Sequence, residues 1–545
     1  MSNGIYEGMD ADTTLTVDLA TLPDDTAVLK QLVVQLFEEL QKAKAALQRQ
    51  EHHMHLLLRR LYGSTSEKFD PQQALLFDPR PEGDESAENK VVPPAAESTT
   101  QRTANRDRHG RGRIPETVHH EEVLHDLTDA EKEALGGTDN LIELPPEQSE
   151  QLDWRPSTLV ALVHVRKKYA RREQLPESGL TLAEQNVVVA PKPAEAIPGG
   201  LAAPGLLAQV IVSKGADHLP LHRLEGIFKR QGVRISRQTM DGWWLQTAEF
   251  LQPLYALAVR VVLASRVVHT DDTSVKVRDA WRKLKHTGRF WPYVGDPLHP
   301  LTVFDYTATH QRAGPAAFLK DYRGYLQADA FNGYDGIYLE SQGRIIEVAC
   351  WAHARRKYHE HRQLDPPRME TALAWIGKLY AIEKDLRERR QTQWRELPYE
   401  EQAAQVAAER QLRSRPLLEG FHAWLETESP KVLPKSDVRG AMDYTLSNWV
   451  ALCRYTESGW LDIDNNEGEN AVRGIALGRK NWLFCGSDRG GRAAAIHFSL
   501  LNSCKRHGLD PWVYYRDILI RLPGMLPGGS EEELLALLPH RWRPA

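Results

Sequence analysis

A short apolar run of this chain ends in two neighbouring acids: Val267-Val268-His269-Thr270-Asp271-Asp272-Thr273. A second run of the same kind ends in one acid: Gly324-Tyr325-Leu326-Gln327-Ala328-Asp329-Ala330. A third stretch begins like a capped helix and carries an acid in its first turns: Asp464-Asn465-Asn466-Glu467-Gly468-Glu469-Asn470-Ala471-Val472-Arg473. Either Asp alone would be read as a turn or cap residue. The ordered set of Asp271, Asp329 and Glu469 is more informative than any one of them.

Three such acids suit metal-dependent phosphoryl transfer. Carboxylate oxygens are ligands for Mg²⁺ or Mn²⁺, and two ions about 3.5–4 Å apart stabilise the attacking and leaving oxygens of an in-line displacement. Residues 260–350 predict the order strand, strand, strand, helix, strand, which is that of an RNase H-like sheet. Asp271 on the first strand and Asp329 at the end of the fourth are then neighbours. The alternative for Glu469 is a surface ion pair with Arg473, four residues further along the helix.

Four blocks, in the same order, resemble the signatures of the transposase family of insertion sequence 66. They are His269-Thr270-Asp271-Asp272-Thr273-Ser274-Val275, Gly324-Tyr325-Leu326-Gln327-Ala328-Asp329, Cys350-Trp351-Ala352-His353-Ala354-Arg355-Arg356-Lys357 and Leu477-Gly478-Arg479-Lys480-Asn481-Trp482-Leu483-Phe484. The resemblance extends from about Leu29 to Trp542.

This resemblance implies a DDE-type DNA transposase with Asp271, Asp329 and Glu469 as catalytic and metal-binding acids. It implies two Mg²⁺ (or Mn²⁺) ions, cleavage at the ends of an insertion sequence, and strand transfer into target DNA. Small accessory proteins encoded by the same element are possible partners. Two alternatives stay open: a nuclease of the same fold without strand transfer, and a catalytically inactive DNA-binding regulator.

The composition predicts a multidomain α/β protein of the cytoplasm. A chain of 545 residues is long enough for three to five units. No apolar stretch of about 18 residues predicts a membrane span, and four scattered cysteines predict no disulfide framework. The net charge of −5 does not exclude DNA binding, because local basic patches suffice.

The N-terminal third predicts three segments. Residues 1–25 are expected to be a disordered acidic tail. Residues 26–63 carry apolar side chains every seven residues and predict a coiled coil that forms a homo-oligomer; a long helix packed within its own domain is the alternative. Residues 64–115 are expected to be a linker, in which Arg111 and Arg113 resemble an AT-hook that binds the minor groove. A merely solvated basic linker is equally compatible.

The middle of the chain predicts a small unit and then a helical one. Residues 116–198 resemble a zinc ribbon that lacks the family's cysteines, so no structural zinc is expected. Residues 199–259 predict a helix-turn-helix, with Arg234, Arg237 and Gln238 at the start of its second helix, where DNA contacts are made. A structural helical hairpin is the alternative.

The remainder predicts the catalytic domain (residues 260–500), with a helical insertion at about 366–434, followed by a C-terminal helical cap (residues 501–545). Cationic, amide and aromatic side chains near the acids suit phosphate contacts and base stacking. The candidates are His353, Arg356, Arg473, Arg479, Lys480, Asn481 and Trp482. Solvated positive faces are the alternative.

Overall fold

The computed structural model describes residues 114–116, 118–155, 158–171, 187–279, 284–329, 332–526 and 528–544. All of them belong to one compact unit, residues 65–545. The expected acidic tail, the coiled coil and the linker with Arg111 and Arg113 lie outside the described residues, so they stay predictions. None of the described helices is both long enough and apolar enough to cross a membrane.

The first part of the described chain is a small sheet with one short helix. Strand β3 (Thr158–Arg171) is at its centre, paired antiparallel with β2 (Leu141–Arg155) and β4 (Val187–Val189) and parallel with β1 (His119–His125). Helix α2 (Asp129–Ala134) begins at a capping box. β3 begins at residue 158, because residues 141–155 form the other arm of a hairpin.

Four helices follow: α3 (Pro204–Gly215), α4 (Leu221–Arg230), α5 (Arg237–Phe250) and α6 (Gln252–Leu263). The Ser236 hydroxyl accepts a hydrogen bond from the Thr239 amide and caps α5, as the sequence predicted. The expected pair of helices around residues 231–236 is therefore present.

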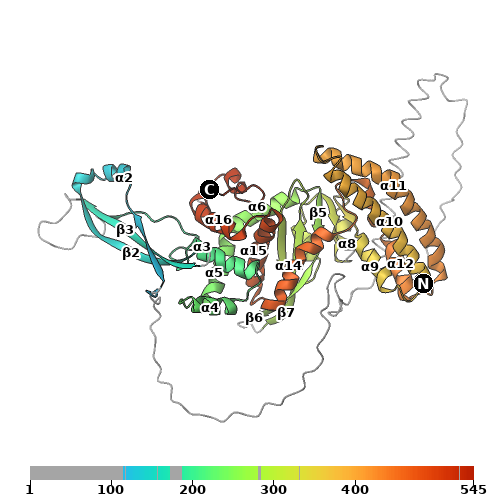
Figure 1. The fold of residues 1–545 in the computed structure, drawn as a ribbon, viewed down its shortest axis with the longest axis horizontal. Coiled ribbons are helices and arrows are strands. Elements are labelled where there is room, and N and C mark those ends of the chain that lie inside the picture. The colour runs from blue at the N-terminus through green and yellow to red at the C-terminus, as the bar shows by residue number, and fades with distance from the viewer. Residues whose placement is uncertain are drawn as a thin grey trace, which may run out of the picture. The chain divides into compact units, whose positions relative to one another are not determined.

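A six-stranded mixed sheet forms the centre of the molecule (Figure 1). Its order is β10-β9-β5-β7-β6, with β8 also paired to β7. The strands are β5 (Val267–Thr270), β6 (Thr273–Asp279), β7 (Leu284–Val294), β8 (Thr302–Thr307), β9 (Gly324–Gln327) and β10 (Ile345–Val348). β5 and β6 pair with successive parts of β7, so they act as one strand that is interrupted at residues 271–272. β9 and β10 continue the sheet in parallel on the other side of β5.

Two helices from the C-terminal part of the chain pack against this sheet, and two more pack on its neighbouring helices (Figure 1). α14 (Asn466–Trp482) lies over β5, β6 and β7, and α15 (Asp488–Arg506) packs on β8. α16 (Pro511–Met525) packs on α3, and α17 (Glu531–Leu535) on α6. The short helices α7 (Ala313–Phe318) and α8 (Asn332–Glu340) connect β8, β9 and β10.

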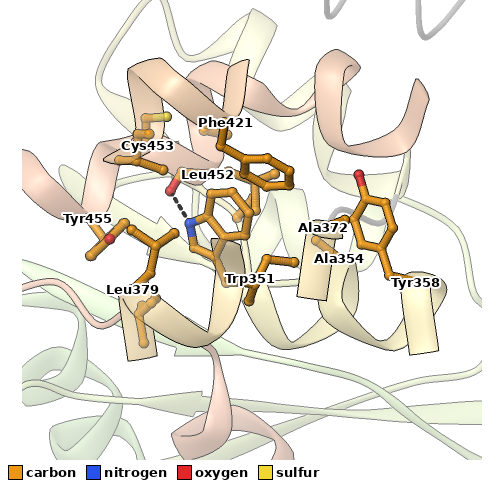
Figure 2. Close-up of a cluster of buried hydrophobic side chains, with 14 of the residues drawn as sticks. Trp351, Ala354, Tyr358, Ala372, Leu379, Phe421, Leu452, Cys453 and Tyr455 are labelled. Atoms are coloured by element: carbon orange, nitrogen blue, oxygen red, sulfur yellow. Dashed lines mark hydrogen bonds between the residues drawn. The ribbon is translucent and has the colours of Figure 1, made fainter. Parts of the chain in front are cut away.

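The region expected as a helical insertion is helical. It comprises α10 (Pro366–Gln391) and α11 (Tyr399–Glu428), between α9 (Trp351–Glu360) and the helices α12 (Asp437–Ser447) and α13 (Trp449–Cys453). Trp351 at the start of α9 is fully buried among side chains of these helices, and its indole donates to the Leu452 carbonyl at 2.7 Å (Figure 2). The insertion therefore shares one apolar core with α9, directly after the last strand of the sheet.

Candidate active site

Asp271 and Asp272 lie in the break between β5 and β6, but their surroundings differ. Asp272 forms ion pairs with Arg289 and, at 3.3 Å, with His310. Asp271 accepts the Asp272 amide at 2.7 Å. Burial raises its pKa well above the usual value, and the charge of Asp329 raises it further. A carboxyl that is buried beside other acids needs a proton or a cation. Of the two adjacent acids, Asp271 is thus the one that lacks a cationic partner among these contacts.

Asp329 follows β9 at the same edge of the sheet. Because β9 pairs in parallel with β5, with His269 opposite Gln327, the two strands lead their acids to the same place. The expectation that these strands are neighbours is confirmed. The charges of Asp329, Asp272 and Glu469 all raise the pKa of Asp271, so the three predicted acids interact electrostatically.

Glu469 lies in the first turn of α14, which approaches β5 closely. Asn465, before the helix, donates from its side-chain amide to the Thr270 carbonyl at 2.7 Å, one residue before Asp271. A Cβ on Gly468 would come within 2.8 Å of Asn465 and 3.1 Å of the Thr270 carbonyl, so only glycine allows this approach. The Asn465 side chain makes no helix-cap hydrogen bond, contrary to the sequence expectation, because it links α14 to β5 instead.

The side chain of Glu469 faces α9. Its Oε1 lies 3.6 Å from Nδ1 of His353, and its Oε2 lies 4.0 Å from Arg356. These contacts replace the alternative pairing with Arg473. Burial raises the pKa of Glu469, whereas burial and the charges of Arg356 and Lys357 lower the pKa of His353 to about 4. His353 is therefore a neutral imidazole beside an acid rather than a free cation for DNA.

Two buried polar residues that the sequence analysis did not single out, Gln327 and His269, help to position the acids. The amide of Gln327 donates to the carbonyls of Asp462 at 2.6 Å and Asp464 at 3.1 Å, and so holds the segment before α14 over the end of β9. The His269 ring lies 3.3 Å from the side-chain oxygen of Asn465. The sequence could have indicated their role, because His269 and Gln327 are polar residues inside apolar strands, where a buried polar group needs a partner.

The other half of α14 carries most of the remaining predicted contacts. Arg479 is partly buried and donates to Thr273 Oγ1 at 2.9 Å and to the Ser274 carbonyl at 2.5 Å, so it fastens α14 to β6. Lys480 and Asn481 are exposed, and Trp482 is half-buried. Arg356 and Arg473 are exposed as well.

A strained turn ends α14. Leu483 has φ 65° and ψ −41°, and the Phe484 amide donates to the Trp482 carbonyl at 2.8 Å, which makes a γ-turn. Leu483 and Phe484 are 61% and 41% exposed. The Cys485 amide then donates to Lys276 of β6 at 2.9 Å, so the turn is fixed on both sides. Strained residues held in this way are concentrated at functional sites.

The predicted helix-turn-helix presents its polar residues to solvent. Arg234, Arg237 and Gln238 are all exposed, while Met240 and Trp244 bury the opposite face of α5. Lys229 and Arg230 at the end of α4 are exposed too. This surface is cationic and accessible.

The residues at the break fit divalent cations of the Mg²⁺ type. All three acids supply carboxylate oxygens, the ligands such ions require. The carboxyl of Asp271 is disfavoured as an anion by burial and by the neighbouring acids. This indicates a place where positive charge is needed.

Comparison with known proteins decides the family. The family model described as "Transposase IS66 family" matches residues 199–493, which include the whole sheet, all three acids and the insertion. The chain belongs to the IS66 transposase family. A second model, described as "Transposase C of IS166 homeodomain", matches residues 49–123. The resemblance inferred from the four sequence blocks is confirmed.

Relatives of this IS66-family chain come from Sinorhizobium fredii (strain NBRC 101917 / NGR234). It is similar to "Uncharacterized protein y4hP", at 28% identity over 84% of this chain and 82% of that protein. It is also similar to "Uncharacterized protein y4jD", at 30% identity over 72% of this chain and 75% of that protein. Membership of a transposase family implies that the chain binds DNA.

Proposed function

We propose that this protein is a DDE transposase that cleaves DNA at the ends of an insertion sequence and joins them to target DNA in the cytoplasm. One observation carries the proposal. Asp271 and Asp329 end two parallel neighbouring strands, and α14 brings Glu469 over the same edge, where the charges of the three acids interact. An RNase H-like sheet is part of the proposal. It is supported by the sheet topology: β7 pairs antiparallel with β5, β6 and β8, and β9 and β10 extend the sheet in parallel beyond β5. Asp271 follows β5, and Asp329 follows β9.

The acids would hold the divalent ions, which when bound stabilise the charge on the attacking and leaving oxygens of the phosphodiester. Asp271 and Asp329 would contribute ligands to both ions, and Glu469 would complete one of the two metal positions. The chain itself would contribute positioning: Gln327 and Asn465 fix the segment that carries Glu469, and Arg289 neutralises Asp272. No protein nucleophile is required for this chemistry.

DNA would run along the exposed cationic surfaces. Lys480, Asn481 and Arg473 of α14 and Arg356 of α9 are accessible near the acids, and the strained turn at Leu483 adds two apolar side chains. Arg234, Arg237 and Gln238 would contact a second stretch of the element end. Arg479 and His353 have intramolecular roles instead.

The decisive experiment is end cleavage in Mg²⁺ on DNA that carries the termini of the element encoding this chain. We expect Asp271→Asn, Asp329→Asn and Glu469→Gln each to abolish cleavage and leave DNA binding nearly intact, because an amide keeps the shape but not the charge that the ions need. Asp272→Asn is the matched control and should retain cleavage, because Asp272 is paired with Arg289. Wild-type cleavage by any of the first three would remove that residue from the site.

Strand transfer separates the proposal from its nuclease alternative. Pre-cleaved ends with free 3′-hydroxyl groups should be joined to a supercoiled target by the purified protein. Cleavage without joining would indicate a nuclease of the same fold. Absence of both, with all three acids present and DNA bound, would indicate a DNA-binding regulator.

A further inference from the structure

A second set of metal-ligating side chains lies beside the three acids and shares one of them. Cys350, His353 and Glu469 each offer one ligand atom, and these atoms lie within 4.8 Å of one another. Sulfur and nitrogen ligands are foreign to Mg²⁺, which prefers oxygen, but they suit Zn²⁺ and its relatives. We propose that Cys350, His353 and Glu469 form a separate soft-metal site for Zn²⁺ or a chemically similar ion.

The backbone brings these ligands together from two helices. Cys350 follows β10 at the N-cap of α9, and His353 lies three residues further on, in the first turn. Residues three apart share one face of a helix, and Glu469 of α14 faces the same place. Zinc distances of about 2.0–2.3 Å separate tetrahedral ligand atoms by roughly 3.3–3.8 Å. His353 Nδ1 and Glu469 Oε1 are already 3.6 Å apart, and a contraction of about 1 Å or less from the 4.8 Å limit would bring the whole set to that geometry.

Two orphaned atoms mark the position of the ion. Nδ1 of His353 and Oε1 of Glu469 are both buried, and neither has a hydrogen-bond partner. Buried polar atoms nearly always have partners, and at 3.6 Å these two are too far apart to serve each other. A cation between them would satisfy both.

Burial raises the pKa of the Cys350 thiol to about 12, so the metal ion itself must displace the proton when the thiolate forms. Sγ of Cys350 accepts the Asn465 amide at 3.2 Å, and hydrogen bonds of this kind orient and tune metal ligands. The N-terminus of a helix favours negative charge. Three protein ligands would leave a fourth position for water, as in open zinc sites.

An ion would enter this site from the solvent side and displace the Arg356 guanidinium from Glu469. Nδ1 of His353 and Oε1 of Glu469 are themselves buried, but other atoms of the two side chains, which are 23% and 30% exposed, border solvent beside the site. Arg356 lies 4.0 Å from Oε2 of Glu469 and is 44% exposed, so its guanidinium is free to move into solvent. Cys350 itself is buried, and it would form the closed end of the site.

The shared ligand has a consequence that rests on the proposed function. An ion held by Cys350 and His353 would bind Oε1 of Glu469 and draw its carboxylate toward α9, away from the oxygen-ligated position beside Asp271. Occupation of the soft-metal site should therefore stop Mg²⁺-dependent cleavage. The chain would sense soft divalent ions through its third acid.

Binding is tested with Co²⁺ on the full-length protein, without DNA. We expect one Co²⁺ per chain to give a sulfur-to-cobalt charge-transfer band that Zn²⁺ removes; Co²⁺ bound by the carboxylates alone gives no such band. Cys350→Ser should abolish the band, and the matched control Cys453→Ser, at another buried cysteine, should retain it. His353→Asn should weaken binding at least about tenfold, with circular dichroism unchanged. A missing band in the wild type, or an equal band in Cys350→Ser, would overturn the site; if Cys350→Ser does not fold, His353→Asn decides.

Inhibition is tested separately. Zn²⁺ at a concentration that saturates the Co²⁺-binding site should stop cleavage by the wild type in excess Mg²⁺, but not cleavage by Cys350→Ser. Equal inhibition of both proteins would refute the sharing of Glu469. If neither protein cleaves DNA, the proposed function fails, whereas the cobalt spectrum still reports on the soft-metal site.

Discussion

At the scale of single residues, the contacts of the two neighbouring acids assign them different roles. The sequence identified Asp271 and Asp329 because each ends an apolar run in a recognised block, and Glu469 because it lies in a helix start upstream of another block. It could not reveal that Asp272 is neutralised by Arg289, or that His353 lies against Glu469, because both contacts join segments far apart in the chain. Gln327 and His269 could have been found, since a polar residue inside an apolar strand needs a partner.

Gly468 tests how closely α14 must approach β5. We expect Gly468→Ala to reduce cleavage by roughly tenfold to a hundredfold, because its Cβ would meet Asn465 at 2.8 Å and displace Glu469. Gly474→Ala is a control on the same helix, where nothing lies within 4 Å of the new Cβ. It should keep cleavage and stabilise the helix by about 0.5–1 kcal/mol. Equal activities of the two variants would show that the close approach is not required.

Asp271 also predicts how stability depends on pH. Its raised pKa means that the ionised carboxylate destabilises the folded chain. The cost is absent below the unfolded-state pKa of about 3.9, grows as the pH rises, and is complete above the folded-state pKa. Without divalent ions, Asp271→Asn should thus match the wild type at low pH and melt at a higher temperature at neutral pH. Mg²⁺ should stabilise the wild type but not the variant; a lower melting temperature for Asp271→Asn at neutral pH would contradict this.

At the scale of elements, the periodicity of the sequence predicted the strands and helices, but it did not predict where a strand is interrupted. The sequence predicted one strand around Asp271, whereas the chain forms β5 and β6 with the acids in between. That break depends on pairing with β7, because β5 and β6 meet different parts of it. The insertion was expected to be helical, and it is. Its inner face forms a core with α9 and the segment before α14, which the sequence did not reveal.

Arg410 of α11 shows what the insertion contributes. Its guanidinium pairs with Glu383 of α10 and donates to the carbonyls of Tyr455, Ser458 and Leu461, each at 2.8 Å. Arg410→Ala leaves Glu383 buried without its cation and should lower the free energy of unfolding by about 3–5 kcal/mol. Arg413→Ala removes a partly exposed pair with Asp385 and should cost about 0–1 kcal/mol. Urea denaturation compares them, and equal losses would mean that the pair does not anchor this segment.

At the scale of the whole molecule, the part of the chain that the structure describes contains nearly the whole of the transposase family match. The transposase model spans residues 199–493, and the described helices and strands extend beyond it at both ends. Residues 26–63 are different, since their role rests on the heptad pattern alone: Val33, Leu40, Leu47, Met54 and Leu61 recur every seven residues. The homeodomain model begins at residue 49, so the two interpretations overlap there.

We propose that residues 26–63 join two copies of the chain as a parallel coiled coil, because an apolar seam is buried only when a partner helix covers it. Transposition must also bring two element ends together, which two linked copies would do. Gln50 in the seam is compatible with a dimer, where it can face its twin. Deletion of residues 26–62 should therefore halve the mass measured by light scattering and leave the circular dichroism of the remaining fold intact. An unchanged mass would mean that this helix packs within its own chain and that any dimer forms through the rest of the molecule.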